Sequence, residues 1–173
     1  MFIIKKVNFK KRAFSLVEIV IVLGIMTLGL LGVASLILQN MQVEILNKDY
    51  LVASMLAQEG LEIVRNIRDD NWVKSLDWLD GIPSTGTFVL DYRGKGSINT
   101  TPNVNGDSGT LLYFGANNYY THQVSSAPSG FFRLLTTVES DDGTYVLLNC
   151  DVMWNSRFGE RHYTVSTTLY NWR

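Results

Sequence analysis

The sequence predicts an α+β protein in which one long amino-terminal helix packs on a carboxyl-terminal antiparallel β-sheet. Three observations predict this fold class: an uncharged apolar run near the amino end, an amphipathic pattern that continues it, and alternating β-forming residues in the second half. With 173 residues, the chain has room for one modest domain and an accessory segment.

The amino end is basic, whereas the rest of the chain is acidic. Residues 1–13 hold five basic side chains and no acidic one, namely Lys5, Lys6, Lys10, Lys11 and Arg12. Of the 15 basic side chains in the whole chain, ten therefore remain against 16 acidic ones, which gives the body a net charge of −6. This acidic body disfavours a nucleic-acid partner.

The apolar run extends from Ile19 to Leu38, without charge and without proline. As a helix at about 1.5 Å per residue it spans roughly 30 Å, which is the hydrocarbon thickness of a bilayer. The preceding positive charges predict that the amino end stays in the cytoplasm and the carboxyl domain lies outside. A secretory signal peptide is the nearest alternative, with a poor cleavage site at 32–35, although its apolar run usually has only about 7–15 residues.

Glu18 lies at the cytoplasmic edge of the apolar run, where a carboxylate without a partner is costly. No Lys or Arg occurs in the following helical turns to pair with it. A cut after Ala13 would give Phe14 a new positively charged amine four residues before this carboxylate. That amine, in the same helix or in a staggered neighbour, would be a suitable partner. A plain membrane anchor with a stray edge glutamate is the alternative.

One segment joins these features: Lys11-Arg12-Ala13-Phe14-Ser15-Leu16-Val17-Glu18. It resembles the class III leader of type IV prepilins, in which a basic leader and a small residue precede an aromatic residue and a glutamate at the fifth mature position. The resemblance implies that a prepilin peptidase cuts between Ala13 and Phe14 and methylates the Phe14 amine. The family usually has glycine at the position of Ala13, but alanine is still small, so cleavage is expected.

The same resemblance assigns roles to the charged residues of this segment. Lys10, Lys11 and Arg12 are the leader charges, and residues 1–13 are the leader peptide that is removed. Glu18 is the assembly residue, which pairs with the amine of an adjacent subunit in the filament.

After Leu38 the pattern becomes amphipathic. One apolar stripe has spacings of 4, 7, 4, 7 and 4: Met41, Ile45, Val52, Leu56, Ile63 and Ile67. Because no proline occurs before Pro83, one helix from about Phe14 to about Asp69 is expected, on the order of 80 Å long. Its membrane half is 14–38 and its amphipathic half is 39–70, an arrangement that resembles the spine of a pilin.

The segment from Leu56 to Arg65 (sequence LAQEGLEIVR) resembles minor pilins of the pilus-modification type and some type II secretion pseudopilins. The resemblance implies a minor subunit and not the bulk one. An ordinary amphipathic helix with conveniently placed charges is the alternative.

Residues 71–173 are predicted to form a globular β-rich head. The strand candidates are Thr87–Tyr92, Thr110–Phe114, Phe131–Glu139, Tyr145–Trp154 and Arg161–Tyr170. The fourth candidate places Val146, Leu148, Cys150, Val152 and Trp154 on one face, and Asp142-Gly143 predicts the hairpin turn before it. The chain has one cysteine, Cys150, which excludes an intramolecular disulfide and is interpreted as a core residue. Gly94–Gly109 is predicted to be a polar loop.

Catalytic and metal-binding motifs are weak. Gly106-Asp107-Ser108-Gly109 matches the nucleophile tetrapeptide of trypsin-like proteases, but His122 and His162 both follow Ser108, which reverses the order of that family. Asn103, Asn105 and Asp107 are spaced as in a calcium loop, but the first aspartate and the distant glutamate are missing. Two distant histidines and one cysteine do not support zinc. No enzyme activity, cofactor or metal is predicted.

Aromatic residues of the head have two interpretations. Tyr119 and Tyr120 could form a sugar- or base-stacking surface with Trp72, Trp78, Trp154 and Trp172. Aromatic residues in a small β-rich body more often belong to the core, which is the preferred interpretation.

Together these observations predict a non-enzymatic structural (minor) subunit of a type IV pilus or pseudopilus. The implied partners are prepilin peptidase, other pilin subunits in a helical filament, the inner-membrane assembly platform and the lipid bilayer. The implied location is the cytoplasmic (inner) membrane, crossed once with the amino terminus in the cytoplasm, and then an extracellular or periplasmic filament. A pilus-tip binding module (an adhesin or a DNA-uptake subunit), a type II secretion pseudopilin and a membrane-tethered hydrolase that uses Ser108 are the alternatives.

Overall fold

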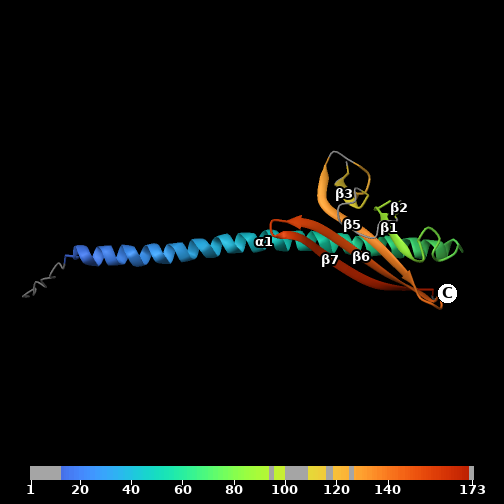
Figure 1. Cartoon of the computed structure of the whole chain (residues 1–173), viewed down its shortest axis with the longest axis horizontal. Coiled ribbons are helices and arrows are strands. Elements are labelled where there is room, and N and C mark those ends of the chain that lie inside the picture. The colour runs from blue at the N-terminus through green and yellow to red at the C-terminus, as the bar shows by residue number, and fades with distance from the viewer. Residues whose placement is uncertain (1–12, 94–95, 100–108, 116–118, 125–126, 172–173) are drawn as a thin grey trace, which may run out of the picture. The chain divides into compact units, whose positions relative to one another are not determined.

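The computed structural model describes residues 13–93, 96–99, 109–115, 119–124 and 127–171, in which one helix precedes seven strands (Figure 1). The chain divides into two compact units, Met1–Ile45 and Leu46–Arg173. Within the described residues, the first unit contains Ala13, Phe14, Ser15 and the beginning of the helix, and the second contains the rest of the helix and every strand. The α+β class predicted from the sequence is confirmed.

Helix α1 extends from Leu16 to Val73 and ends four residues later than predicted. After Val73, Ser75 adopts a left-handed backbone conformation with φ 57°. The backbone N–H of Leu76 then donates to the carbonyl of Asn71 at 2.9 Å. The backbone N–H of Ser75 donates to the carbonyl of Trp72 at 3.1 Å. This pair of bonds satisfies carbonyls in the last helical turn, as in a Schellman motif. The usual glycine is absent from this motif, so the helix end carried no sequence signal.

The described part of the first unit is largely apolar and exposed. From Leu16 to Leu38 the large hydrophobic side chains of α1 are all exposed. The helix has the length and composition needed to cross a membrane. Exposed apolar side chains in this number require burial in lipid or against other chains.

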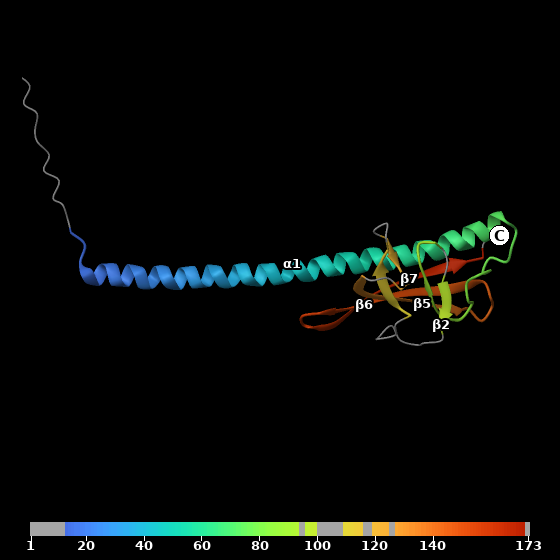
Figure 2. The ribbon, with the colours of Figure 1, turned by 90° about the horizontal axis from the view of Figure 1, so that it is seen from above.

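The second unit contains an antiparallel sheet in which the three longest strands form the meander β5–β6–β7 (Figure 2). β1 and β3 both pair with β5, β2 pairs with β1, and β4 pairs with β3. The strands are β1 (Gly86–Leu90), β2 (Gly96–Asn99), β3 (Leu111–Phe114), β4 (Tyr120–Thr121), β5 (Pro128–Glu139), β6 (Tyr145–Ser156) and β7 (Gly159–Tyr170).

All five strand predictions are confirmed with shifted ends, and two further strands were missed. The hairpin turn at Asp142-Gly143 is confirmed by the positive φ of Gly143 and its amide bond to the Ser140 carbonyl, at 3.0 Å. β2 lies inside the segment 94–109, so the loop prediction is wrong at 96–99; the other residues of the segment except Gly109 lie outside the described ones. β2 and β4 have four and two residues, too few to display a periodic pattern.

The core lies between the inner face of the sheet and the carboxyl-terminal half of α1. The alternation predicted for β6 is confirmed, because the inward side chains are at most 2% exposed: Val146, Leu148, Cys150, Val152 and Trp154. The stripe predicted on α1 is only partly right. Leu56 and Ile63 are buried and Val52 and Ile67 pack against the core, but Met41 and Ile45 are exposed.

Small residues bring α1 close to the sheet. Ala53 and Ala57 are fully buried, and Gly60 continues the same face. A Cβ atom added at Gly60 would lie 3.0 Å from Cys150 Sγ and 3.4 Å from Arg133 Cδ. Such a distance is shorter than ordinary van der Waals contact, so the helix can approach β5 and β6 this closely only without a side chain at position 60.

Arg133 is buried completely inside this head, which the sequence did not predict. From β5 its Nη1 donates to the Leu56 carbonyl of α1 at 3.0 Å, and its Nη2 donates to the Leu90 carbonyl of β1 at 2.7 Å. Nη1 also lies 3.5 Å from the Glu59 carboxylate, whose side chain is 35% exposed. One guanidinium therefore ties helix, sheet centre and the end of β1 together.

Candidate functional site

The predicted cleavage site lies just before α1. Ala13, Phe14 and Ser15 have no regular secondary structure, and the helix begins at Leu16. Ala13 is exposed and the Phe14 side chain is 76% exposed. A peptidase needs an accessible, non-helical peptide bond, and the bond between Ala13 and Phe14 meets both conditions.

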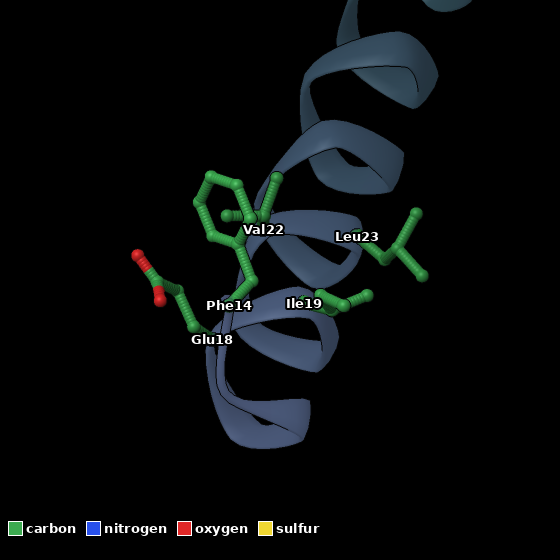
Figure 3. Close-up of a pocket in the computed structure, with 5 residues that line it drawn as sticks. All are labelled: Phe14, Glu18, Ile19, Val22 and Leu23. Atoms are coloured by element: carbon green, nitrogen blue, oxygen red, sulfur yellow. The ribbon is translucent and has the colours of Figure 1, made fainter. Parts of the chain in front are cut away.

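Glu18 occupies the first turn of α1, four residues after Phe14. Together with Ile19, Val22 and Leu23 these two residues line a shallow surface hollow of about 220 Å³ (Figure 3). Figure 3 shows the Glu18 carboxylate projecting outward from the helix, whereas Ile19 and Leu23 point to another side. The positive end of the helix dipole favours a carboxylate here by about 0.3–1 kcal/mol.

The Glu18 carboxylate has no ion-pair partner within the part of the chain that the structure describes. No basic side chain of that part lies within 4.0 Å of it, since the ion pairs found there all involve other acids. The predicted leader charges Lys10, Lys11 and Arg12 lie outside the described residues. The local arrangement is therefore an accessible backbone junction, an aromatic residue, and a carboxylate at the start of an exposed apolar helix.

This arrangement is that of a chain with one helix long and apolar enough to cross a membrane, preceded by an exposed, non-helical junction. Residues 8–34 match the family described as the prokaryotic N-terminal methylation motif. The match of the amino-terminal segment supports a type IV pilin-like prepilin with a class III leader. A search of curated proteins and a search of solved structures each found no match to the chain.

The other candidate chemistry of the sequence has no counterpart in the described residues. Ser108 and the residues of the calcium-loop pattern, Asn103, Asn105 and Asp107, lie outside them. Across the described ranges, no three His, Cys, Asp or Glu side chains are grouped so that they could hold a metal ion. Proteins of the methylation-motif family are structural and not catalytic.

Cys150 is a buried core residue. It is fully inaccessible, and burial raises the pKa of its thiol to about 12. The thiolate is the reactive form of cysteine, so this residue is inert at neutral pH. The interpretation of Cys150 as a small core side chain is confirmed.

The two histidines have opposite surroundings. Burial, assisted by the Arg133 guanidinium, lowers the pKa of His122 to about 4. His162 lies on the exposed face of β7, where hydrogen bonding to Glu160 and then to Asp151 raises its pKa. Protonation of His122 therefore destabilises the folded head, whereas protonation of His162 stabilises it.

Mild acid is expected to destabilise the head through His122. Its folded pKa lies below the unfolded value of about 6.5, so the unfolded chain binds more protons as the pH falls. Between about pH 7 and about pH 5 this costs about 2 kcal/mol of unfolding free energy. Denaturant titration of the full chain in detergent measures the loss, which His122→Gln should largely remove.

His162→Gln is the control for this experiment. Because the folded pKa of His162 is raised, its stabilisation is present at low pH and is lost as the pH rises through that value. The His162→Gln variant should therefore retain the acid loss or increase it. Equal acid loss in the wild type and in His122→Gln would contradict the assignment.

Proposed function

We propose that the chain is a structural, minor subunit of a type IV pilus or pseudopilus. A prepilin peptidase removes residues 1–13 and methylates the Phe14 amine, and the mature subunit enters a helical filament through its amino-terminal helix. The observation that carries the proposal is the methylation motif in register with an exposed, non-helical bond between Ala13 and Phe14. The role is scaffolding, without catalysis.

The physical reason for assembly is the exposed apolar surface of α1. Before assembly, the bilayer covers the membrane half, 14–38, with the amino end in the cytoplasm and the head, 71–173, outside. In the filament, helices of other subunits replace the lipid. The amphipathic half, 39–70, carries the head.

The Phe14 amine of a neighbouring subunit is the proposed partner of Glu18, which has no ion-pair partner among the described residues. A carboxylate inside the apolar region is costly unless a positive group accompanies it. Pairing of Glu18 with the amine of an adjacent subunit satisfies both charges only when subunits are in the correct stagger. The pair therefore sets the axial position of one helix against the next.

The assignment to a minor subunit rests on the segment from Leu56 to Arg65. Two of its residues have structural roles in the head, since Gly60 permits the close approach of α1 and Glu59 lies beside Arg133. Its resemblance to modification-type minor pilins and to type II secretion pseudopilins supports a specialised subunit. The assembly platform of the inner membrane and the other pilins are the expected partners.

Processing by a prepilin peptidase tests this proposal. In membranes that contain the peptidase, the Ala13→Gly variant should lose its leader at least as fast as the wild type, because glycine is the usual residue there. Ala13→Trp should remain uncut, since a large side chain occupies the position of a small one. The mass difference between precursor and mature chain, followed over time, measures both rates.

The matched control is Ala34→Trp, which changes a small residue far from the junction. This variant should be processed at the wild-type rate. Slower cutting of Ala13→Gly, or normal cutting of Ala13→Trp, would contradict the assigned site.

A further inference from the structure

Two tyrosines form an exposed stack on the head. The rings of Tyr92 and Tyr119 lie 5.1 Å apart between centroids and are inclined by 29°. Their side chains are 44% and 57% exposed, although the sequence favoured a core position for Tyr119. The core interpretation is confirmed for other aromatic residues of the head: Trp72, Trp78 and Trp154. An exposed ring pair does not contribute to the core, so it needs another explanation.

The stack borders a shallow, open cleft of about 300 Å³ between α1 and the turn after β1. From the helix the cleft is lined by Ile63, Asn66, Ile67 and Asp70, and from the turn by Tyr92 and Arg93. Ile63 is buried and Ile67 half-buried, so they form the floor, whereas Asn66 and Asp70 are exposed at the rim. An apolar floor, an aromatic wall and a few polar groups are the usual composition of a small-molecule site.

The Arg93 guanidinium at the rim is held in place. It donates to Asp91 Oδ2 from Nη2 at 2.6 Å and from Nε at 3.1 Å, and it lies 5.5 Å from the centroid of the Tyr92 ring. Thr121 Oγ1 also donates to Asp91 Oδ2, at 2.9 Å. Burial alone would raise the pKa of Asp91, but these hydrogen bonds outweigh it and lower the pKa, which keeps the carboxylate charged.

The charges around the cleft are balanced. Arg93 is paired with Asp91, and Lys74 Nζ lies 2.5 Å from Asp70 Oδ2. A phosphate-bearing polymer needs unpaired positive charge, which these two ion pairs do not provide. An apolar peptide would cover Asn66 and Asp70 without satisfying their hydrogen bonds, at a cost of about 1–3 kcal/mol for each buried polar group.

We propose that this cleft binds a neutral carbohydrate. A sugar ring has apolar C–H faces, which suit the isoleucine floor and the part of the Tyr92 ring that Tyr119 and Arg93 leave exposed. Its hydroxyl groups both donate and accept hydrogen bonds. Asp70 accepts such hydrogen bonds, Arg93 donates them, and the Asn66 amide does both. The exposed Tyr119 ring next to the cleft stacks on the following sugar, so the site takes an oligosaccharide.

Saturation-transfer NMR on the full chain tests this proposal, in micelles of a detergent without a sugar headgroup. The probes are maltotriose, cellotriose and triacetylchitotriose. At least one trisaccharide should receive saturation from the protein. The dissociation constant of that trisaccharide should rise at least about tenfold in the Tyr119→Ala variant and in the Asn66→Ala variant, which corresponds to about 1.4 kcal/mol.

The matched control is Tyr170→Ala, which removes a tyrosine that is 54% exposed on β7. This variant should bind the trisaccharide as the wild type does. The proposal is overturned if no trisaccharide receives saturation, if Tyr119→Ala binds unchanged, or if oligothymidylate binds in the cleft in place of the sugars. Because the measurement uses single subunits, its result is independent of whether the chain enters a filament.

Discussion

Glu18→Ala should leave membrane insertion intact and reduce incorporation into the filament at least about tenfold. Insertion depends on the apolar run, which the substitution lengthens. Incorporation depends on the pairing of the carboxylate with the Phe14 amine of a neighbour in an apolar environment. A tenfold loss corresponds to about 1.4 kcal/mol, which is modest for an ion pair in hydrocarbon. Quantitative immunoblotting of membrane and sheared-filament fractions measures the ratio.

Glu44→Ala provides the control, because Glu44 is an exposed carboxylate of the same helix outside the uncharged run. It should enter filaments normally. Normal incorporation of Glu18→Ala would refute the pairing, and loss of both variants from the membrane fraction would show that insertion, not assembly, had failed.

Arg133→Ala should destabilise the head by about 3–5 kcal/mol. The substitution leaves a cavity in the core and removes the hydrogen bonds to the carbonyls of Leu56 and Leu90. A head with ordinary stability of about 5–15 kcal/mol would lose much of it. Denaturant titration of the full chain in detergent, followed by the fluorescence of the buried tryptophans, gives the free energy of unfolding.

Two variants place limits on this interpretation. Arg157→Ala removes an exposed arginine from the turn between β6 and β7 and should change stability by less than about 0.5 kcal/mol. Glu59→Gln should cost less than Arg133→Ala, because it removes the carboxylate 3.5 Å from the guanidinium but leaves the two hydrogen bonds to carbonyls. An unfolding free energy for Arg133→Ala within about 1 kcal/mol of the wild type would contradict the role of the guanidinium.

The elements with long, regular patterns were predictable from the sequence. The alternation along β6 follows from the two-residue period of a strand with one buried face, and the structure buries the expected side. The continuous helix follows from the apolar run, its amphipathic continuation and the absence of proline. The methylation motif is local in the sequence, so it could be recognised without knowledge of the fold.

The missed features depend on tertiary packing. Ala53, Ala57 and Gly60 form the closest helix–sheet contact, but small residues carry little weight in a hydrophobic pattern. In the sequence, Arg133 has the pattern of an ordinary charged residue on a strand. Its burial is possible because the guanidinium donates hydrogen bonds to two carbonyls from other elements. Tyr92 and Tyr119 stack although β2 and β3 separate them in the sequence. A contact between residues so far apart has no regular spacing from which it could be predicted.

The amino terminus of the protein recovered from membranes and from sheared filaments distinguishes a processed prepilin from a plain membrane anchor. Mass spectrometry of the intact chain and of its first peptide determines it. We expect a chain that begins at Phe14 and carries an N-methyl group. A chain that begins near Met1 would contradict it and leave a plain membrane anchor, and one that begins after Ala34 would indicate a secreted domain without a spine.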